Sequence, residues 1–515
     1  MGQDPTNKPR PGFQGSETSW VELIVYSQGG DPIVVKSKGR QSMQGRYRTD
    51  PDHTLITLGT NKGLASTGNF QATIKPSRSS KDSPLERVVD DDWVDVVFHR
   101  HDKTWHTMRG LVTDLRRTRT VTANGATSWT YTLAGQDFQR IFDITPIWFN
   151  RFSQKLENAA GSLALQIFTG VPNIGGSPTA TVRGMLMGWF RELQNLGRAT
   201  WKIPETVPNT LGTFYQDIER GWNSEGFSGV PERSSINPNL MNPSGNLWQL
   251  AKEWADPGFL EFFCDLGKFG AQLPAGEELR VEDSTISVFL RDRPFPLHEG
   301  LTDHQGIRPP ITLGIGRDSA WFNLPTHIVP RQQVGSDDLG RSGSERYNAF
   351  FVSPQTTMEL TRTAPPDMLP PLWDESDILL HGLRRYDVST KYKAEAGTLL
   401  ALSTIQRQMA RDWFAINPYL LNGTIPLGVL RPEIHVGTRI LIPGDNGDTS
   451  QDETYYVENV AHNWTFGPGG KTVLSVTRGW QGDDNSLLQA VTELAGRYRV
   501  PNIGDPEAVE DWATA

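Results

Sequence analysis

Apolar and polar positions alternate through residues 453–480 in a way that predicts a β-hairpin. In the first half of this stretch, Tyr455 and Val457 fall on one face of an extended chain, while Tyr456 and Val460 fall on the other. A Gly-Pro-Gly-Gly run then supplies the turn, because glycine adopts positive φ without steric cost. Both faces carry apolar residues. We therefore expect the hairpin to be covered on both sides, by the interior of its own barrel and by a neighbour.

Residues 105–138 repeat this layout in the first third of the chain. A strand from Gly110 to Leu115 continues into an Arg- and Thr-rich stretch, and a turn at 123–125 leads to a return strand from Thr127 to Leu133. Two hairpins of like design suggest two related β-barrels. Because the likeness lies in pattern rather than in identity, a true internal repeat and two independent hairpins both remain open.

Short alternating runs separated by Gly and Asn turns make the N-terminal part β-rich, as in a small barrel or sandwich. Elsewhere, strand-like runs mix with stretches of helical period. The strands expected from these patterns lie at 20–26, 33–35, 54–58, 69–74, 93–98, 259–265, 286–291, 347–353, 423–427 and 439–442. The helices are expected at 163–168, 182–196, 247–254, 394–414 and 487–497.

These patterns predict a mainly β chain with α+β insertions, divided into six parts. A run rich in Gly, Ser, Pro and Asn marks a long loop at 221–245, and residues 297–345 show no regular pattern and are also expected to be a loop. The expected parts are a flexible arm at 1–18, a first β-barrel at 19–145, a helical and loop insertion at 146–245, a central α+β domain at 246–345, a second β-barrel at 346–480 with a helical insertion at 380–420, and a C-terminal helix with an acidic tail at 481–515.

Composition narrows the function. With 515 residues the chain is long enough for several domains. Its net charge of -9 argues against a nucleic-acid-binding surface, which needs clustered Lys and Arg, but does not exclude an acidic lumen through which DNA slides. A single cysteine, Cys264, rules out a disulfide within the chain and indicates assembly in a reducing compartment. No apolar run approaches the roughly 20 residues that span a membrane, and no secretory signal is visible.

The histidines at 99, 101 and 106 are the first candidates for chemistry. His99 and His101 would share one face of a strand, with His106 nearby, and such a pair can hold a metal. The polar outer face of a strand explains them more simply. Asp90, Asp91 and Asp92 suggest a cation site or half of an acid–base pair, but carboxylates at a strand entry usually lie in water.

Three further motifs have structural explanations and do not indicate a binding or catalytic site. Residues 445–448 (Asp-Asn-Gly-Asp) lack the ligand order of an EF-hand and read as a turn. Residues 467–472 (GPGGKT) fail the phosphate-loop pattern, because Thr465 stands at the first glycine position and no helix follows. Cys264 lies in an apolar strand and reads as a packed thiol. We therefore assign no catalytic, cofactor-binding or metal-binding residue.

The order of several motifs resembles one known family. The helix and strands of 246–293 end in the run 288–295 (Val-Phe-Leu-Arg-Asp-Arg-Pro-Phe), and they are followed by 422–425 (Asn-Gly-Thr-Ile), 432–438 (Pro-Glu-Ile-His-Val-Gly-Thr) and the closing strand 472–479. This series is similar to the central domain and second barrel of phage tail baseplate hub proteins, which occur in contractile tails and related injection systems. With the N-terminal barrel, the resemblance covers most of residues 20–480.

The resemblance implies a structural role without catalysis or cofactor. Hubs of this family are homotrimers whose two barrels per chain form a pseudo-sixfold ring. The ring joins the hexameric tail tube to the central spike and encloses the channel for DNA and the tape measure protein. The implied partners are the tube or a tube adaptor, the spike, the tape measure protein and surrounding baseplate proteins, with no membrane and no specific nucleic-acid binding. The implied location is the virion baseplate, assembled in the cytoplasm of the bacterial host.

In a hub, we expect Trp464, Phe466 and Trp480 to be packing or interface aromatics. Two alternatives remain. A β-rich carbohydrate-active or carbohydrate-binding protein would use the 16 tryptophans for sugar stacking, with exposed Trp pairs beside two carboxylates. A hub with its own wall-degrading activity would need a compact extra domain, and none is visible in the sequence.

Overall fold

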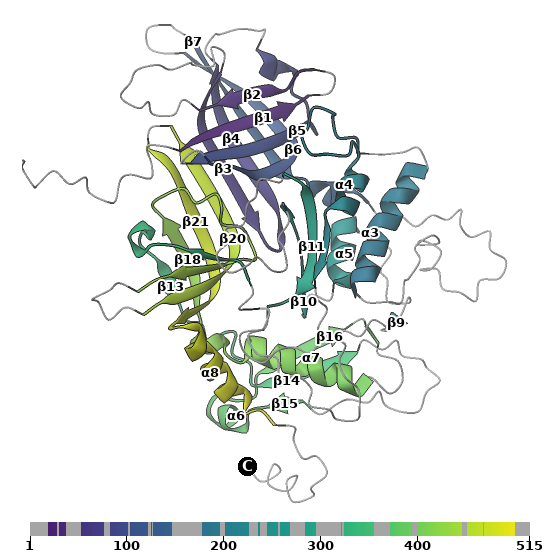
Figure 1. Ribbon diagram of the computed structural model, residues 1–515, viewed down its shortest axis with the longest axis vertical. Coiled ribbons are helices and arrows are strands. Elements are labelled where there is room, and N and C mark those ends of the chain that lie inside the picture. Colours follow the sequence, from purple (N-terminus) through teal and green to yellow (C-terminus); the bar gives the residue numbers. More distant parts are fainter. Residues whose placement is uncertain are drawn as a thin grey trace, which may run out of the picture.

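The protein is mainly β, with a large, mostly antiparallel sheet and helices set around it (Figure 1). No helix among the residues described is both long and apolar enough to cross a membrane. The computed structural model describes residues 19–27, 30–37, 53–76, 83–100, 103–121, 125, 127–146, 178–195, 201–225, 235–236, 245–255, 258–267, 284–294, 321, 324–354, 371–390, 392–393, 399–444, 451–466 and 468–499.

Seven N-terminal strands form a closed ring of pairings. The order is β3-β2-β1-β5-β6-β7-β4, and β4 pairs again with β3, so that the first and last strands meet. All of these pairings are antiparallel except the single parallel pair between β2 and β3. The strands are β1 (Trp20–Tyr26), β2 (Ile33–Lys36), β3 (His53–Gly63), β4 (Ser66–Pro76), β5 (Trp93–Arg100), β6 (Lys103–Val121) and β7 (Thr127–Asp137), with a 3-10 turn η1 (Pro84–Arg87) before β5.

The alternation along β1 explains why this first ring closes around a core. Val21, Leu23 and Val25 are fully buried and point into the ring, while the residues between them lie on its outer face. On β5 both faces are buried, because Trp93 packs outward against a second core and Val94 packs inward. The run of apolar residues at 93–98 thus reflects a strand covered on both sides.

A second set of strands near the C-terminus surrounds its own core. Its order is β12-β19-β20-β21-β18-β13, and the short chain from β12 to β13, through η4 (Arg331–Gln333), links the two ends. Ile425, Ile440, Val457 and Val476 are among its buried residues. The strands are β12 (Thr326–Ile328), β13 (Asp338–Gly340), β18 (Leu421–Leu427), β19 (Arg439–Ile442), β20 (Glu453–Thr465) and β21 (Gly469–Gln481).

The two strand rings are joined edge to edge. β20 of the second ring pairs antiparallel with β3 of the first, from Asn459 opposite Gly63 to Thr465 opposite Thr57. Thirteen strands therefore form one continuous hydrogen-bonded sheet. We call the β3–β20 pairing the seam.

A central unit packs beside the seam (Figure 1) and shares the largest core with the smaller unit described below. Its helices pack through aromatic rings. Phe142, Phe190 and Phe214 are in mutual contact at centroid distances of 5.4–5.8 Å. Its strands are β8 (Trp222–Glu225), β10 (Leu260–Leu266) and β11 (Ile286–Asp292), and its helices are α1 (Arg140–Ile144), α3 (Pro178–Asn195), α4 (Phe214–Arg220) and α5 (Leu247–Trp254).

A smaller unit lies at the end of the molecule where the chain finishes (Figure 1). Its three-stranded sheet runs β15-β14-β16, and a two-residue pair of β9 with β17 lies apart from it. The elements are β9 (Ser235–Ile236), β14 (Ala349–Pro354), β15 (Leu372–Trp373), α6 (Glu375–His381), β16 (Arg385–Thr390), β17 (Tyr392–Lys393), α7 (Leu399–Phe414), η5 (Asn417–Tyr419) and α8 (Asp484–Ala495).

Most strands and helices expected from periodicity are confirmed within a few residues. Both hairpins are longer than expected, since β6 reaches Val121 and β21 reaches Gln481. The expected helix at 163–168 lies outside the described residues. The elements α4, α6, β12 and β13 were not anticipated, because each is too short to show a clear period. The mainly β fold class is confirmed, whereas the domain limits and the trimer stay predictions.

Candidate functional site at the junction of the strand rings

The two faces of β20 belong to different cores, which confirms the expected cover on both sides. Val460 was expected on the Tyr456 face but packs in the second-ring core, because the pairing shifts register between Val457 and Asn459. Tyr455 points into the second ring, and its neighbour Tyr456 points into the central unit. The Tyr456 hydroxyl donates to the Glu261 carboxylate on β10 at 2.7 Å. Arg291 on β11 bonds the same hydroxyl at 3.1 Å and Glu261 at 3.0 Å. Tyr456, Glu261 and Arg291 form what we call the tyrosine junction.

The geometry at Gly437 completes this junction. Arg291 Nη2 donates to the Gly437 carbonyl at 2.8 Å. Gly437 has φ of +71°, and a Cβ there would lie 2.6 Å from Arg291 Nη2, so both the backbone conformation and this contact favour glycine. Burial raises the pKa of Tyr456 well above its usual value, and the Glu261 charge adds to this effect. Burial also lowers the pKa of Arg291, but Tyr456 and Glu261 outweigh that effect and raise it.

A second buried cluster links both rings to the central unit. Lys62 on β3 lies 2.7 Å from Asp265 on β10 and 4.0 Å from Asp137 at the end of β7. On the other side of Asp265, Nδ1 of His435 lies 3.3 Å away. All four side chains are buried. We call these four residues the lysine junction.

The charges of the lysine junction compensate one another in a buried region. Burial raises the pKa of Asp265, but Lys62 and His435 outweigh it and hold that pKa low. Burial lowers the pKa of Lys62, and the two carboxylates reverse this and raise it. Burial raises the pKa of Asp137 to about 7, against the opposing effect of the more distant Lys62.

A cavity of about 20 Å³ lies within the lysine junction. It has room for about one water molecule, which its polar side chains would bind. His462 also lines it, and burial lowers the pKa of that histidine to about 3, so the ring is neutral at ordinary pH. The remaining lining residues include Thr60, Thr107, Met108 and Val436.

A third charged contact ties the first ring to the central unit. Nε and Nη2 of Arg109 on β6 donate to the two carboxylate oxygens of Asp95 on β5, at 2.7 and 2.8 Å. The remaining nitrogen, Nη1, donates to the Ser284 carbonyl at 2.9 Å. The Tyr26 hydroxyl donates to Asp95 as well. Together these bonds satisfy a bidentate ion pair that is fully buried.

The three contacts are suited to holding units in register rather than to reacting with a substrate. In each contact, a charged side chain is paired with a group from another unit or another strand. None of the three contacts opens onto a large pocket. Among the residues described, no group of three His, Cys, Asp or Glu side chains is arranged to bind a metal ion.

The histidines predicted as candidates lie apart from these junctions. The His99 ring stacks on Trp20 at 3.5 Å, and its Nε2 lies 3.2 Å from Glu22. His106 is on β6, and burial lowers its pKa. His101 lies outside the described residues, so a metal at His99 and His101 stays untested.

The other candidates have structural roles wherever the structure describes them. The buried Asp92 accepts a hydrogen bond from Val89 N at 2.9 Å, and Asp91 lies 3.5 Å from Arg140. Cys264 is buried in β10, where burial raises its pKa well above the usual value, so it is no ready nucleophile. Residues 469–472 of the GPGGKT run belong to β21. Residues 445–448 lie outside the described part.

The three expected interface aromatics behave differently. Trp464 belongs to β20 of the second ring, but its side chain is buried in the core of the first ring. There its Nε1 donates to the Ser19 carbonyl at 3.3 Å. Trp480 is half-buried and donates to the Ser486 hydroxyl at 2.8 Å. Phe466 is 47% exposed beside the seam. Trp464 therefore locks the rings of one chain together, and Phe466 is available for contact outside it.

The described tryptophans are covered, either wholly or in part. Trp93, Trp254, Trp321, Trp413 and Trp464 are buried in the cores. Every other tryptophan that the structure describes is at least partly covered.

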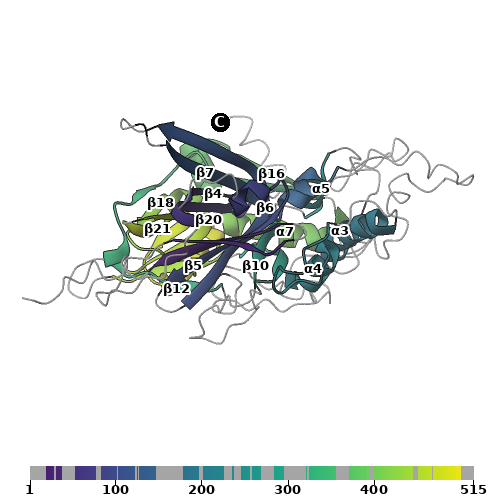
Figure 2. The same ribbon diagram turned by 90° about the horizontal axis from the view of Figure 1, so that it is seen from above.

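The outer part of the β6–β7 hairpin projects from the sheet (Figure 2), and its β6 residues are exposed while the paired β7 residues are half-buried. On this hairpin the Trp129 ring lies 4.8 Å from the guanidinium group of Arg117 and 5.5 Å from that of Arg119. Val121 near the tip is 61% exposed. A two-stranded ribbon is marginally stable alone in water, so this basic arm is suited to contact with another molecule.

Sequence reasoning missed the residues of the lysine and tyrosine junctions. A signal was present in the run 259–265, where Glu261 and Asp265 interrupt an otherwise apolar strand. A carboxylate in a strand buried on both faces must have a partner. The partners Lys62 and Tyr456 lie about 200 residues away in sequence, and nothing local identifies them.

No protein-family model and no curated protein matches the chain. Among solved structures, the chain is similar to a tail protein from Neisseria meningitidis, with 12% identity, a TM-score of 0.43, and coverage of 89% of this chain and 96% of that one. It is also similar to the 43 kDa tail protein of prophage MuSo2 from Shewanella oneidensis, with 12% identity, a TM-score of 0.45, and coverage of 89% and 98%.

A third similar structure is an E. coli component of the type VI secretion system, described as structurally similar to the T4 bacteriophage tail proteins gp27 and gp5. The identity is 8%, the TM-score 0.40, and the coverage 84% of this chain and 75% of that one. The structural neighbours are therefore tail proteins and a secretion-system component. The function proposed below is argued from the residues and geometry of this chain.

Proposed function

We propose that the protein is a structural baseplate hub of a phage tail or a related injection system. In this role, three copies form a ring that joins the hexameric tail tube to the central spike and encloses the channel for DNA and the tape measure protein. The proposal keeps two ring units around a central unit. The first is near 19–145. The second was expected at 346–480, and it takes β12 and β13 from before that range, while 349–414 belongs to the smaller unit. The ring would assemble in the bacterial cytoplasm and reside in the virion baseplate.

The seam is the observation that carries this proposal. Each chain presents two strand rings with separate cores, and β3 and β20 join them edge to edge through backbone hydrogen bonds. Three chains with two such units each would give six units around an axis, which matches a sixfold partner. The buried charges of the lysine junction and the Trp464 anchor fix the angle between the two units. A fixed angle is what closure of a symmetric ring requires.

Exposed features supply contacts for partners. The basic arm of β6–β7 and Phe466 project from the first ring and the seam. We propose that they contact a neighbouring subunit or the tube. The acidic net charge suits a channel that must not retain DNA.

We assign no catalysis, cofactor or metal to this role. Among the described residues, the large charged clusters are buried, and the charged groups within each cluster bond to one another. The covered tryptophans favour the hub over the carbohydrate-binding alternative, which needs exposed indoles beside two carboxylates.

The experiment that tests the proposal is the mass of the purified protein by light scattering, alone and with its spike, followed by particle averaging. The hub predicts a trimer of about three times 57.4 kDa with a central hole and a near-sixfold outline. A protein that stays monomeric with tube and spike present would contradict the proposal. A monomer that binds or cleaves a polysaccharide would favour the carbohydrate alternative.

A further inference from the structure

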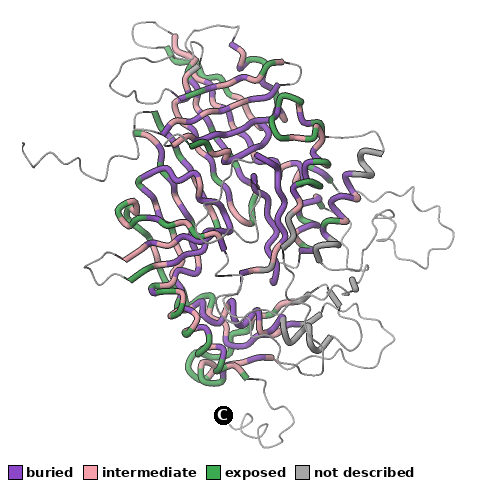
Figure 3. Tube along the Cα trace, in the orientation of Figure 1, coloured by how far each residue is buried: buried purple, intermediate pink, exposed green. Residues whose placement is uncertain are grey.

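The short helix α6 presents its apolar side chains to solvent. Leu379 is 80% exposed, Leu380 is 78% exposed, and Leu383 just after the helix is 57% exposed. No residue of α6 is buried. A surface helix normally turns its apolar face toward the core, so three adjacent exposed leucines form an interaction surface. We call these three residues the leucine patch, which lies in the exposed segment near the C-terminal end (Figure 3).

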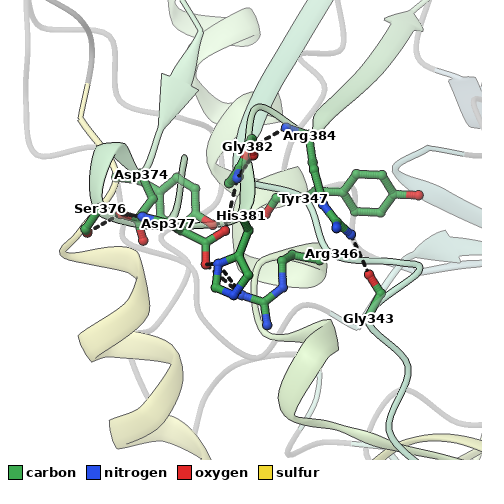
Figure 4. Close-up of polar contacts among 11 residues, drawn as sticks. Gly343, Arg346, Tyr347, Asp374, Ser376, Asp377, His381, Gly382 and Arg384 are labelled. Carbon is green, nitrogen blue, oxygen red and sulfur yellow. Dashed lines mark hydrogen bonds and ion pairs between the residues drawn. The ribbon is translucent and has the colours of Figure 1, made fainter. Parts of the chain in front are cut away.

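Polar contacts fix the opposite face of α6, so the leucines cannot turn inward. Asp377 bonds Arg346 at 2.6 Å and lies 3.1 Å from His381 (Figure 4). The buried Asn348 donates to both Asp377 and the Gly382 carbonyl, at 3.0 and 2.8 Å. Five or more polar atoms would have to be stripped of partners for the helix to rotate.

The backbone around Asn348 adds to this fixation. Arg384 N donates to Asn348 Oδ1 at 2.7 Å, and Asp374 N donates to the Asn348 carbonyl at 3.0 Å. Asp374 also caps the helix through Asp377 N. These hydrogen bonds therefore hold the leucine patch on the outer surface of the folded chain.

The last described residue of the chain, Arg499, lies next to the start of α6. Arg499 pairs with Trp373 through two backbone hydrogen bonds of 2.9 and 3.1 Å, and Trp373 immediately precedes the cap of α6. Residues 500–515 thus leave the described structure beside the helix. At about 3.3 Å per residue, this segment is several times longer than the roughly 10 Å of a seven-residue helix.

The composition of residues 500–515 complements the patch. The segment carries four carboxylates and no Lys or Arg, together with the apolar residues Ile503, Val509 and Trp512. Exposed Arg384 and Arg385 directly follow the leucine patch. An acidic segment with an indole can bury the leucines and place its carboxylates beside these two guanidinium groups.

We propose that residues 500–515 lie over the leucine patch of their own chain, with Val509 and Trp512 against the leucines. The segment then covers an apolar surface of the single chain before assembly. This inference goes beyond the hub role and does not depend on it.

Disulfide trapping in the full chain tests the proposal. Leu383→Cys with Ala513→Cys leaves Leu379, Leu380, Val509 and Trp512 in place. The native Cys264 is buried and unreactive. The matched control joins Ala513→Cys to Val121→Cys at the exposed tip of the β6–β7 hairpin. Under mild oxidation, we expect the patch pair to form an intramolecular disulfide at least about tenfold faster than the control pair, because the segment is held near its site.

Two added variants identify what holds the segment. Val509→Ala with Trp512→Ala should reduce the rate of the patch pair to that of the control. Replacing the four carboxylates by amides should slow it several-fold at low salt and much less at about 1 M salt. Equal rates for the patch and control pairs would overturn the proposal. So would a disulfide that joins two chains, since a second copy would then occupy the patch.

Discussion

Nζ of Lys62 lies 2.7 Å from Oδ1 of Asp265, although the two residues are 203 positions apart in sequence. Lys62 belongs to the seam strand of the first ring, and Asp265 to the central unit. His435 of the second ring approaches the other oxygen of the same carboxylate. One buried carboxylate therefore connects the three largest units of the chain.

Removal of the Lys62 charge should destabilise the protein strongly. Lys62→Met leaves Asp265 buried with His435 as its remaining ionisable partner, and breaking a buried pair in this way costs about 3–5 kcal/mol. The measurement is the free energy of unfolding in urea. Lys36→Met is the matched control, because Lys36 is about half exposed in its pair with Glu22, and such pairs contribute about 1 kcal/mol or less. Equal effects of the two substitutions would refute the role of the lysine junction.

Asp137 should make stability fall as pH rises through neutrality. Its pKa is about 7 in the folded protein, where burial is the main cause, against about 3.9 in an unfolded chain. Between these values the folded state binds more protons than the unfolded state. The stabilisation is thus fully present below about pH 4 and is lost as pH rises through about 7.

The measurement compares the protein with Asp137→Asn, which cannot ionise, in urea at about pH 5 and about pH 8. We expect the free energy of unfolding of the variant, relative to that of the wild type, to be higher at pH 8 than at pH 5 by on the order of 2 kcal/mol. Asp114→Asn, at an exposed site, controls for the loss of a carboxylate. An Asp137→Asn difference that does not change with pH would contradict the expectation.

Loss of the Tyr456 hydroxyl should loosen the second ring from the central unit. Tyr456→Phe leaves Glu261 and Arg291 with one fewer partner in a buried site, which costs about 1–3 kcal/mol. Tyr455→Phe is the neighbouring control, because its hydroxyl bonds Glu453 on the same strand. Urea unfolding measures both. A Tyr455→Phe effect as large as that of Tyr456→Phe would show that the tyrosine junction has no special role.

A charge inside the second ring should prevent assembly. Val476 is 1% exposed in the second-ring core, so Val476→Asp buries an unpaired carboxylate and should abolish ordered particles. Ser475→Asp, one residue earlier, places the same charge on an exposed position. Negative-stain imaging of purified particles distinguishes the two. Normal particles from Val476→Asp would show that this strand does not line a packed layer.

The alternation of apolar residues determined the strands of this protein without help from the rest of the chain. Side-chain direction along a strand depends only on local geometry, so the hairpins at 105–138 and 453–480 could be found from periodicity alone. The carboxylates at Glu261 and Asp265 were visible as charges in an apolar strand, but their partners were not.

The tertiary structure alone decided which strands meet and which way α6 faces. The pairing of β3 with β20 and the contact of Lys62 with Asp265 join segments that are distant in sequence, and local propensity carries no information about such partners. The run Ile378-Leu379-Leu380 is apolar, but Asn348 and Arg346 hold the polar side of α6 against the protein. Buried polar groups must be satisfied, and at α6 this requirement outweighed the burial of leucines.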